Sequence, residues 1–139
     1  MRAVGLDFGT KTIGIAVSDE LGLTAQGQKT LERKSLKKDL AELKRLAEEL
    51  AADRFILGLP LNMDGTEGPR AQAARKFGAA LEAETALPVI YQDERLTTVS
   101  AQRALLEADV SRKKRRDVID QVAATIILQA WLDAQPRSS

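Results

Sequence analysis

The chain has 139 residues, of which 44% are hydrophobic and 29% are charged, and its net charge is +1. This size and balance predict one soluble globular domain with a single core. Cysteine and histidine are both absent, which excludes disulfides, zinc–thiolate sites, imidazole-bound metals, cysteine nucleophiles and Ser–His–Asp triads. Any catalysis must therefore use carboxylates, Lys, Tyr or metal-bound water, and an all-carboxylate ligand set favours Mg²⁺ or Mn²⁺.

The N-terminal residues predict two strands joined by a tight turn, Ala3 to Asp7 and Thr12 to Ser18. Side chains alternate between the two faces of a strand. Asp7 therefore shares a face with Gly5, and the small residue Gly14 lies opposite the branched residues of its strand. Residues 24–30 predict a third, weaker strand. No basic segment followed by an apolar run precedes the first strand, so we expect a cytoplasmic protein.

Strands and helices alternate through the rest of the chain. This order predicts a mixed α/β sheet led by a hairpin, with helices on both faces, in one domain over residues 1–135. The elements expected are a helix from the cap Ser35 to Ala52, a strand from Arg54 to Gly58, a helix from Gly68 to Glu84, a strand from Leu87 to Gln92, a helix from Thr97 or Thr98 to Glu107, a basic connector from Val110 to Arg116, a helix from Asp117 to Gln135, and a frayed tail over 136–139.

Asp7 is the first candidate site residue, because it ends an apolar strand and starts the turn Asp7-Phe8-Gly9-Thr10-Lys11. A carboxylate at the end of a strand fits a site at the edge of a sheet. Thr10 and Lys11 suit contact with phosphate. The alternative is a turn aspartate that bonds its own backbone.

The second candidate carboxylate is one of the neighbours Asp93 and Glu94, which follow a strand. Adjacent residues of an extended chain point to opposite faces, so at most one of the two reaches a shared site. Alternation with Ile90 and Gln92 weakly favours Glu94. The alternative, a surface loop in which one of the acids pairs with Arg95, fits the spacing equally well.

Asp120 is the third candidate, because it heads an apolar stripe on the last predicted helix. Carboxylates are rarely buried without a partner, which favours a site over the alternative of an acid that complements the helix dipole. Asp117, one turn earlier, fits that simpler role. The stripe consists of Ala123, Ala124, Ile127 and Trp131.

Several segments are candidates for contact with phosphate. The loop Gly58 to Gly68 offers polar side chains and the backbone amides of a helix start, although it also reads as a turn rich in helix and strand breakers. An unbroken cationic run precedes the last predicted helix, and its alternative is a solvated surface. The candidates are Asn62, Thr66, Arg70, Arg95, Arg112, Lys113, Lys114, Arg115 and Arg116, with Thr10 and Lys11.

Four motifs appear together and in order: GTKTIGIAVSD after Asp7, GLPLNMDGTEGPRA, DERLTT, and D-x-x-A-A-x-x-I-L from Asp120. The chain closely resembles the YqgF/RuvX family of Holliday-junction resolvases, which is also implicated in ribosomal RNA maturation. Gln121 stands where many relatives have Ser. The resemblance covers all but the tail. It implies an RNase H-like fold, a metal-dependent nuclease, and catalytic, metal-binding acids at Asp7, Glu94 and Asp120.

This resemblance leads us to expect two Mg²⁺ or Mn²⁺ ions about 4 Å apart that hydrolyse a phosphodiester bond. Branched DNA and precursor ribosomal RNA are the expected partners, and symmetrical cutting of a junction favours a homodimer. Two alternatives stay open. One is a non-catalytic nucleic-acid or ribosome-assembly module. The other is a phosphate-binding enzyme like actin or the sugar kinases, which share Asp-x-Gly-Thr but need two such domains.

Overall fold

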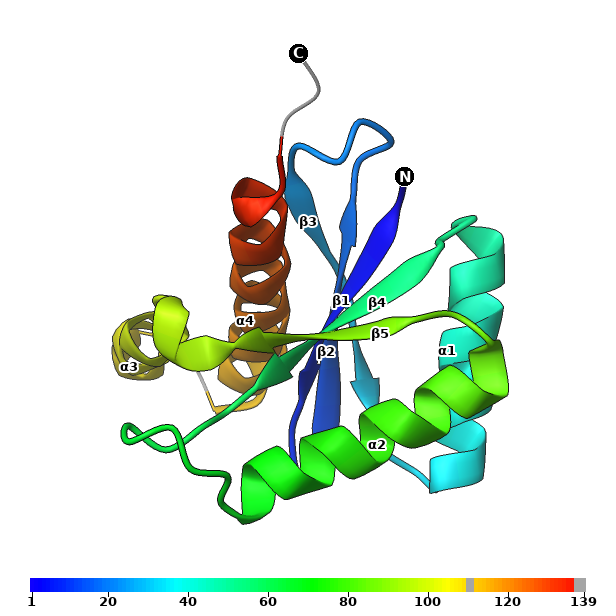
Figure 1. Cartoon of the computed structure of the whole chain (residues 1–139). Helices are drawn as coiled ribbons and strands as arrows, with labels where there is room; N and C mark the ends of the chain where they lie inside the picture. The colour runs from blue at the N-terminus through cyan, green and yellow to red at the C-terminus, as the bar shows by residue number, and fades with distance from the viewer. Residues whose placement is uncertain (110–111, 137–139) are drawn as a thin grey trace.

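The computed structural model describes residues 1–109 and 112–136, and it describes their side chains except over 106–117. A five-stranded sheet in the order β3-β2-β1-β4-β5 forms its centre (Figure 1). The first three strands are antiparallel, and β4 and β5 run parallel to β1, so the sheet is mixed as predicted. The strands are β1 (Ala3–Phe8), β2 (Thr12–Ser18), β3 (Ala25–Glu32), β4 (Arg54–Leu59) and β5 (Val89–Asp93).

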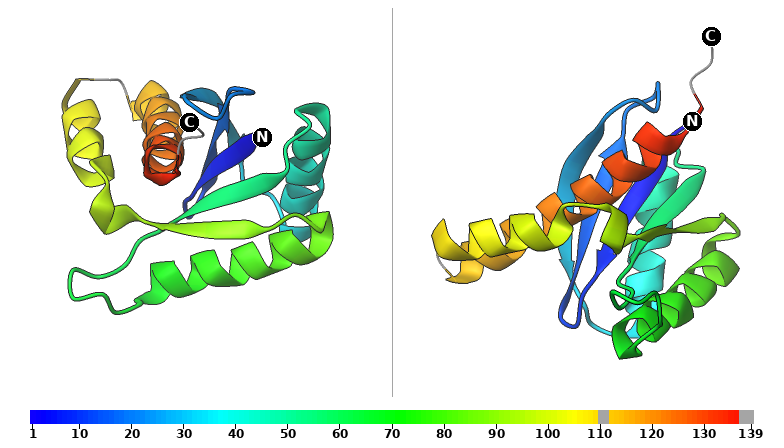
Figure 2. Two further views of the ribbon diagram at one scale, coloured as in Figure 1. Left: turned by 45° about the horizontal axis from the view of Figure 1, so that its top comes forward. Right: turned by 60° about the vertical axis from the view of Figure 1, so that its left-hand side comes forward.

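Helices cover both faces of this sheet (Figure 2). On one face α1 (Leu36–Glu49) and α2 (Pro69–Thr85) enclose the larger hydrophobic core. On the other face α4 (Arg112–Ala134) crosses the strands, with α3 (Val99–Asp109) beside it. A single 3₁₀ turn, η1 (Glu94–Leu96), links β5 to α3. None of the described helices is long and apolar enough to cross a membrane.

The predicted alternation of the first two strands is confirmed. Val4, Leu6, Ile13 and Ile15 are fully buried in the core beneath α1 and α2. The residues between them face α4 instead. Helix α1 begins where predicted, because the Ser35 hydroxyl accepts a hydrogen bond from the backbone N–H of Lys38.

The start of the last helix was predicted wrongly. The sequence predicts a connector from Val110 to Arg116, but α4 begins at Arg112 rather than Asp117. Residues 110 and 111 lie outside the described residues. Arg and Lys favour helices almost as strongly as Ala, so five of them in a row do not prevent the helix from starting early. The basic run therefore belongs to the first turns of α4. Its side chains lie outside the described residues.

Helix α4 lies so close to the sheet that only glycine fits at the contact. A Cβ atom on Gly14 of β2 would stand 2.0 Å from the carbonyl oxygen of Asp120. On the adjacent strand β1, a Cβ on Gly5 would stand 2.6 Å from the Cβ of Leu128. Gly14 is also the cross-strand partner of Asp7. The close contact therefore places the Asp120 backbone beside Asp7.

We expect Gly14→Ala to destabilise the protein by at least about 1–3 kcal/mol, the usual cost of overpacking a core, because its methyl group meets helix backbone that cannot rotate away. Urea unfolding measures the effect. Gly27→Ala is the matched control, since a Cβ there meets the end of the Gln121 side chain at 3.2 Å. Equal stability of the two variants would contradict the close-contact interpretation.

Candidate active site

The three predicted acids lie on the α3/α4 side of the sheet, around one of its edges. Asp7 is near the end of β1 and is only 2% exposed. Glu94 begins η1 directly after β5, and its side chain is 11% exposed. Asp120 lies in α4, above Gly14. The carboxyl ends of parallel strands meet at one edge of a sheet, which is where open α/β sheets bind ligands.

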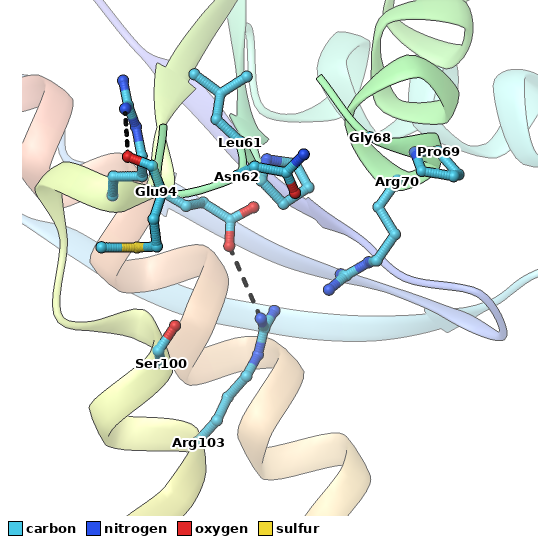
Figure 3. Close-up of a pocket in the computed structure, with 11 residues that line it drawn as sticks. Leu61, Asn62, Gly68, Pro69, Arg70, Glu94, Ser100 and Arg103 are labelled. Carbon is cyan, nitrogen blue, oxygen red and sulfur yellow. Dashed lines mark hydrogen bonds and ion pairs between the residues drawn. The ribbon is translucent and has the colours of Figure 1, made fainter. Parts of the chain in front are cut away.

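An arginine from α3 joins Asp7 to Glu94. Nη2 of Arg103 donates to both carboxylate oxygens of Asp7, at 2.8 Å each. Nη1 of the same guanidinium lies 3.7 Å from Oε1 of Glu94 (Figure 3). Burial opposes the charge of Arg103, but the nearby acids Asp7, Glu94 and Asp120 outweigh it and raise the pKa of the guanidinium. Asp7 therefore bonds a side chain from another element and not its own turn.

Glu94 is held in an environment that disfavours its charge. Burial of the side chain raises its pKa, and the neighbouring charge of Asp7 raises it further. The cations Arg103 and Arg70 act in the opposite direction but do not cancel the rise. Two carboxylates that are partly desolvated and close to each other are typical of sites that bind cations or catalyse reactions.

Asp120 is fixed by a residue of the opening hairpin. The hydroxyl group of Thr12, a buried residue at the start of β2, donates a short hydrogen bond to Oδ2 of Asp120. The predicted apolar stripe that follows Asp120 on α4 is buried against the sheet, as expected. Its members Ala123, Ala124, Ile127 and Trp131 are at most 7% exposed.

The donor chemistry of these groups suits a hard divalent cation. All three acids offer carboxylate oxygens, the ligands that such ions prefer, and Asp7 and Glu94 already share one cationic group, the Arg103 guanidinium. Among the described residues, however, no group of three or more acidic side chains is arranged to hold a metal ion. Asp7 and Glu94 share a cationic partner in the structure, and the binding of a metal ion by Asp7, Glu94 and Asp120 stays a prediction.

A cavity of about 340 Å³ opens beside Glu94. Arg70 and Arg103 point into it from opposite sides (Figure 3). Helix α2 begins at its wall, and its N-cap Gly68 leaves the first backbone N–H groups without a side-chain cap. The remaining lining comes from Pro60, Leu61, Asn62, Met63, Pro69, Arg95 and Ser100.

Other predicted phosphate-binding residues make contacts within the protein. Arg95 pairs with Asp93 at 2.7 Å, as the simpler alternative proposed, and also donates to the backbone oxygen of Met63. The Asn62 side-chain amide donates to the hydroxyl of Thr66 at 2.9 Å, which braces the loop between β4 and α2.

Thr10 and Lys11 are exposed in the turn between β1 and β2. The side chains of Arg112, Lys113, Lys114, Arg115 and Arg116 lie outside the described residues. Contact of either group with phosphate therefore stays a prediction.

The sequence interpretation missed Arg103 and Thr12. Arg103 follows the buried residue Val99 by four positions, so both lie on the same face of α3. A positively charged residue on the buried face of a predicted helix indicates an acidic partner inside the protein, and this was the signal available for Arg103. Thr12 carried no comparable signal, since a threonine that starts a strand is ordinary.

Solved structures identify the fold. A Thermus thermophilus RuvC in complex with a Holliday junction superposes with a TM-score of 0.56 at 13% identity, covering 96% of this chain and 97% of that chain. The fowlpox virus Holliday junction resolvase gives a TM-score of 0.57 at 13% identity, covering 97% and 100% of the two chains. These likenesses confirm the predicted RNase H-like fold.

Sequence relatives identify the family. The family model described as RuvX, Holliday junction resolvase, matches residues 1–134. A Myxococcus xanthus (strain DK1622) protein named "Putative pre-16S rRNA nuclease" is 63% identical over 134 residues, covering 96% of this chain and 89% of the relative. A Geobacillus kaustophilus (strain HTA426) protein of the same name is 53% identical over 137 residues, covering 97% and 99%. Matches of this length and identity show that the chain belongs to the RuvX family of Holliday junction resolvases.

Proposed function

We propose that this protein is a metal-dependent endonuclease that hydrolyses phosphodiester bonds in structured nucleic acid. The substrates named for its relatives and its family, the precursor of 16S ribosomal RNA and the Holliday junction, are the candidates. One observation carries the proposal. Asp7 and Glu94 share the positively charged guanidinium of Arg103 at the edge of the sheet, beside a cavity that arginine side chains line. A phosphodiester has the charge and the oxygen atoms that such a site recognises.

Asp7 and Glu94 would hold the first metal ion, with Asp120 as a further ligand for a second. A Mg²⁺ or Mn²⁺ ion held there would supply an activated water at neutral pH and would stabilise the leaving oxygen. A chain without histidine otherwise lacks a general base for this reaction. The hydroxyl group of Thr12 sets the direction of the Asp120 carboxylate. Burial of Asp7 and Glu94 keeps bulk water away and strengthens their attraction for a cation.

The protein would hold the substrate mainly by its phosphates. Arg70 and the uncapped start of α2 face the cavity beside Glu94, where a phosphate next to the scissile bond would lie. The turn residues Thr10 and Lys11 and the basic run over 112–116 would contact phosphates further along the backbone. Aromatic residues are only 4% of the chain, so stacking on bases plays a small part.

Cutting a four-way junction symmetrically requires two active sites related by a two-fold axis. We therefore propose a homodimer on branched DNA, whereas cleavage of one RNA strand needs a single site. Sedimentation of the protein on a junction distinguishes the two arrangements, because a protein that stays monomeric on the junction contradicts paired cutting.

Replacing one acid should greatly slow cleavage and leave binding of the nucleic acid intact. We expect Asp7→Asn, Glu94→Gln and Asp120→Asn each to slow cleavage by roughly 100-fold or more, the scale of losing one electrostatic contact to a reacting group. Labelled junction DNA and precursor RNA are incubated with Mn²⁺ or Mg²⁺, with EDTA as the control. Wild-type turnover by the Asp120→Asn protein would reject that assignment. Tight binding without metal-dependent cleavage would favour a non-catalytic module.

Removing the hydroxyl group of Thr12 should misdirect Asp120 with little change in packing. Thr12→Val keeps the branched shape in a buried position but leaves Oδ2 of Asp120 without this donor. We expect a loss of cleavage of about 10-fold or more, in line with the 10–100-fold effects of groups that orient metal ligands. Thr12→Ser retains the hydroxyl and serves as the control. Full activity of Thr12→Val would show that the hydrogen bond is dispensable.

Removing the charge of Arg70 should weaken binding of any nucleic acid irrespective of its sequence. We expect the slope of log K against log salt to fall by about 1 for Arg70→Met, because one phosphate contact is lost. Fluorescence anisotropy at several salt concentrations measures this slope. Arg75→Met is the matched control on the same helix, since Arg75 pairs with Glu67 at 2.7 Å and does not line the cavity. Identical slopes for both variants would place the phosphate elsewhere.

A further inference from the structure

We propose that Arg103 competes with the metal ion for Asp7 and Glu94, so that this residue of α3 controls how tightly the site binds metal. In the structure the guanidinium bonds both carboxylate oxygens of Asp7 and lies within ion-pair range of Glu94. Arg103 must therefore leave Asp7 before that carboxylate can bind a divalent cation. The inference rests on the proposed metal-dependent function, and it adds a residue that regulates the affinity of the site.

The first line of evidence is the completeness of the Arg103–Asp7 contact. Both carboxylate oxygens of Asp7 accept from Nη2 at 2.8 Å, so the atoms that would bind a metal are already bonded to a cation. The Asp7 side chain is only 3% exposed, whereas that of Arg103 is 24% exposed. Arg103 is thus the more exposed partner of the pair, and a metal ion can bond these two oxygens only when the guanidinium moves.

The second line of evidence is that Glu94 shares the same guanidinium. Nη1 of Arg103 lies 3.7 Å from Oε1 of Glu94, longer than a hydrogen bond but within ion-pair range. One guanidinium therefore neutralises two acids that would otherwise repel each other in a partly desolvated place. A divalent cation on the same oxygens would repel the guanidinium, so the two cations cannot both occupy the site.

The third line of evidence is that the displaced side chain has somewhere to go. Arg103 lines the 340 Å³ cavity together with Ser100 of its own helix and Arg70 of α2. A rotation about its flexible side-chain bonds would move the guanidinium from Asp7 into that space without moving α3. There it would meet the phosphate that we assign to the same cavity, and a guanidinium binds phosphate with two parallel hydrogen bonds.

Titration of the full chain with Mn²⁺ in the absence of nucleic acid tests the competition. Free Mn²⁺ is followed by its electron paramagnetic resonance signal. We expect Arg103→Met to bind Mn²⁺ at least 10-fold more tightly than wild type, because a neutral side chain of similar length no longer competes. Arg75→Met should bind Mn²⁺ as wild type does. Unchanged or weaker binding by Arg103→Met overturns the inference, since a purely structural arginine would give that result.

A second variant keeps the test decisive if Arg103→Met fails to fold. Arg103→Lys retains the charge but presents a compact ammonium in place of the planar guanidinium, so we expect Mn²⁺ binding tighter than wild type and a larger Mn²⁺-induced rise in Tm. Equal Mn²⁺ affinity in the wild type and in the folded Arg103 variants overturns the competition and leaves the metal-dependent function standing. Absence of Mn²⁺ binding in every one of them overturns both proposals.

Discussion

The contact between α4 and the glycine on β2 is the constraint on which the rest of the site depends. The Cβ of any other residue at position 14 would lie 2.0 Å from the carbonyl oxygen of Asp120, so no side chain fits between the strand and the helix at that point. Because Gly14 is paired with Asp7 across the hairpin, the same contact brings two acids together that are far apart in the chain. The close packing and the arrangement of the candidate site thus have one physical origin.

Gathering acids in a buried place carries an electrostatic cost, and the fold offsets it with nearby donors. Arg103 neutralises Asp7 and Glu94, and Thr12 bonds Asp120. Each of the three acids therefore has a hydrogen bond or an ion pair with a side chain of the protein itself. The arrangement resembles a functional site in which burial and like charge raise the pKa of Glu94 while neighbouring cations limit the rise.

Much of the fold could be predicted because its signals are local. Alternation in the first two strands, the Ser35 cap and the stripe after Asp120 depend only on nearby residues, and each is confirmed. Family resemblance supplied the choice of Glu94 over Asp93, which alternation alone left open. The bond from Arg103 to Asp7 spans 96 positions and depends on how α3 packs, so no local pattern could reveal it. The early start of α4 has no clear local signal, because a run of positive charges suits an exposed connector, although Arg and Lys also favour helices.

The hairpin also has a consequence for how this family can change its sequence. Side chains alternate along a strand, so a slip of one position in the β1–β2 register would turn Asp7 away from α4 and into the apolar core beneath α1. The length of the turn over Gly9–Lys11 therefore decides on which face of the sheet the Asp7 carboxylate lies. The length of the loop before β3 does not determine where any of the three acidic side chains points. We therefore expect insertions and deletions to be far better tolerated in that loop than in the turn between β1 and β2.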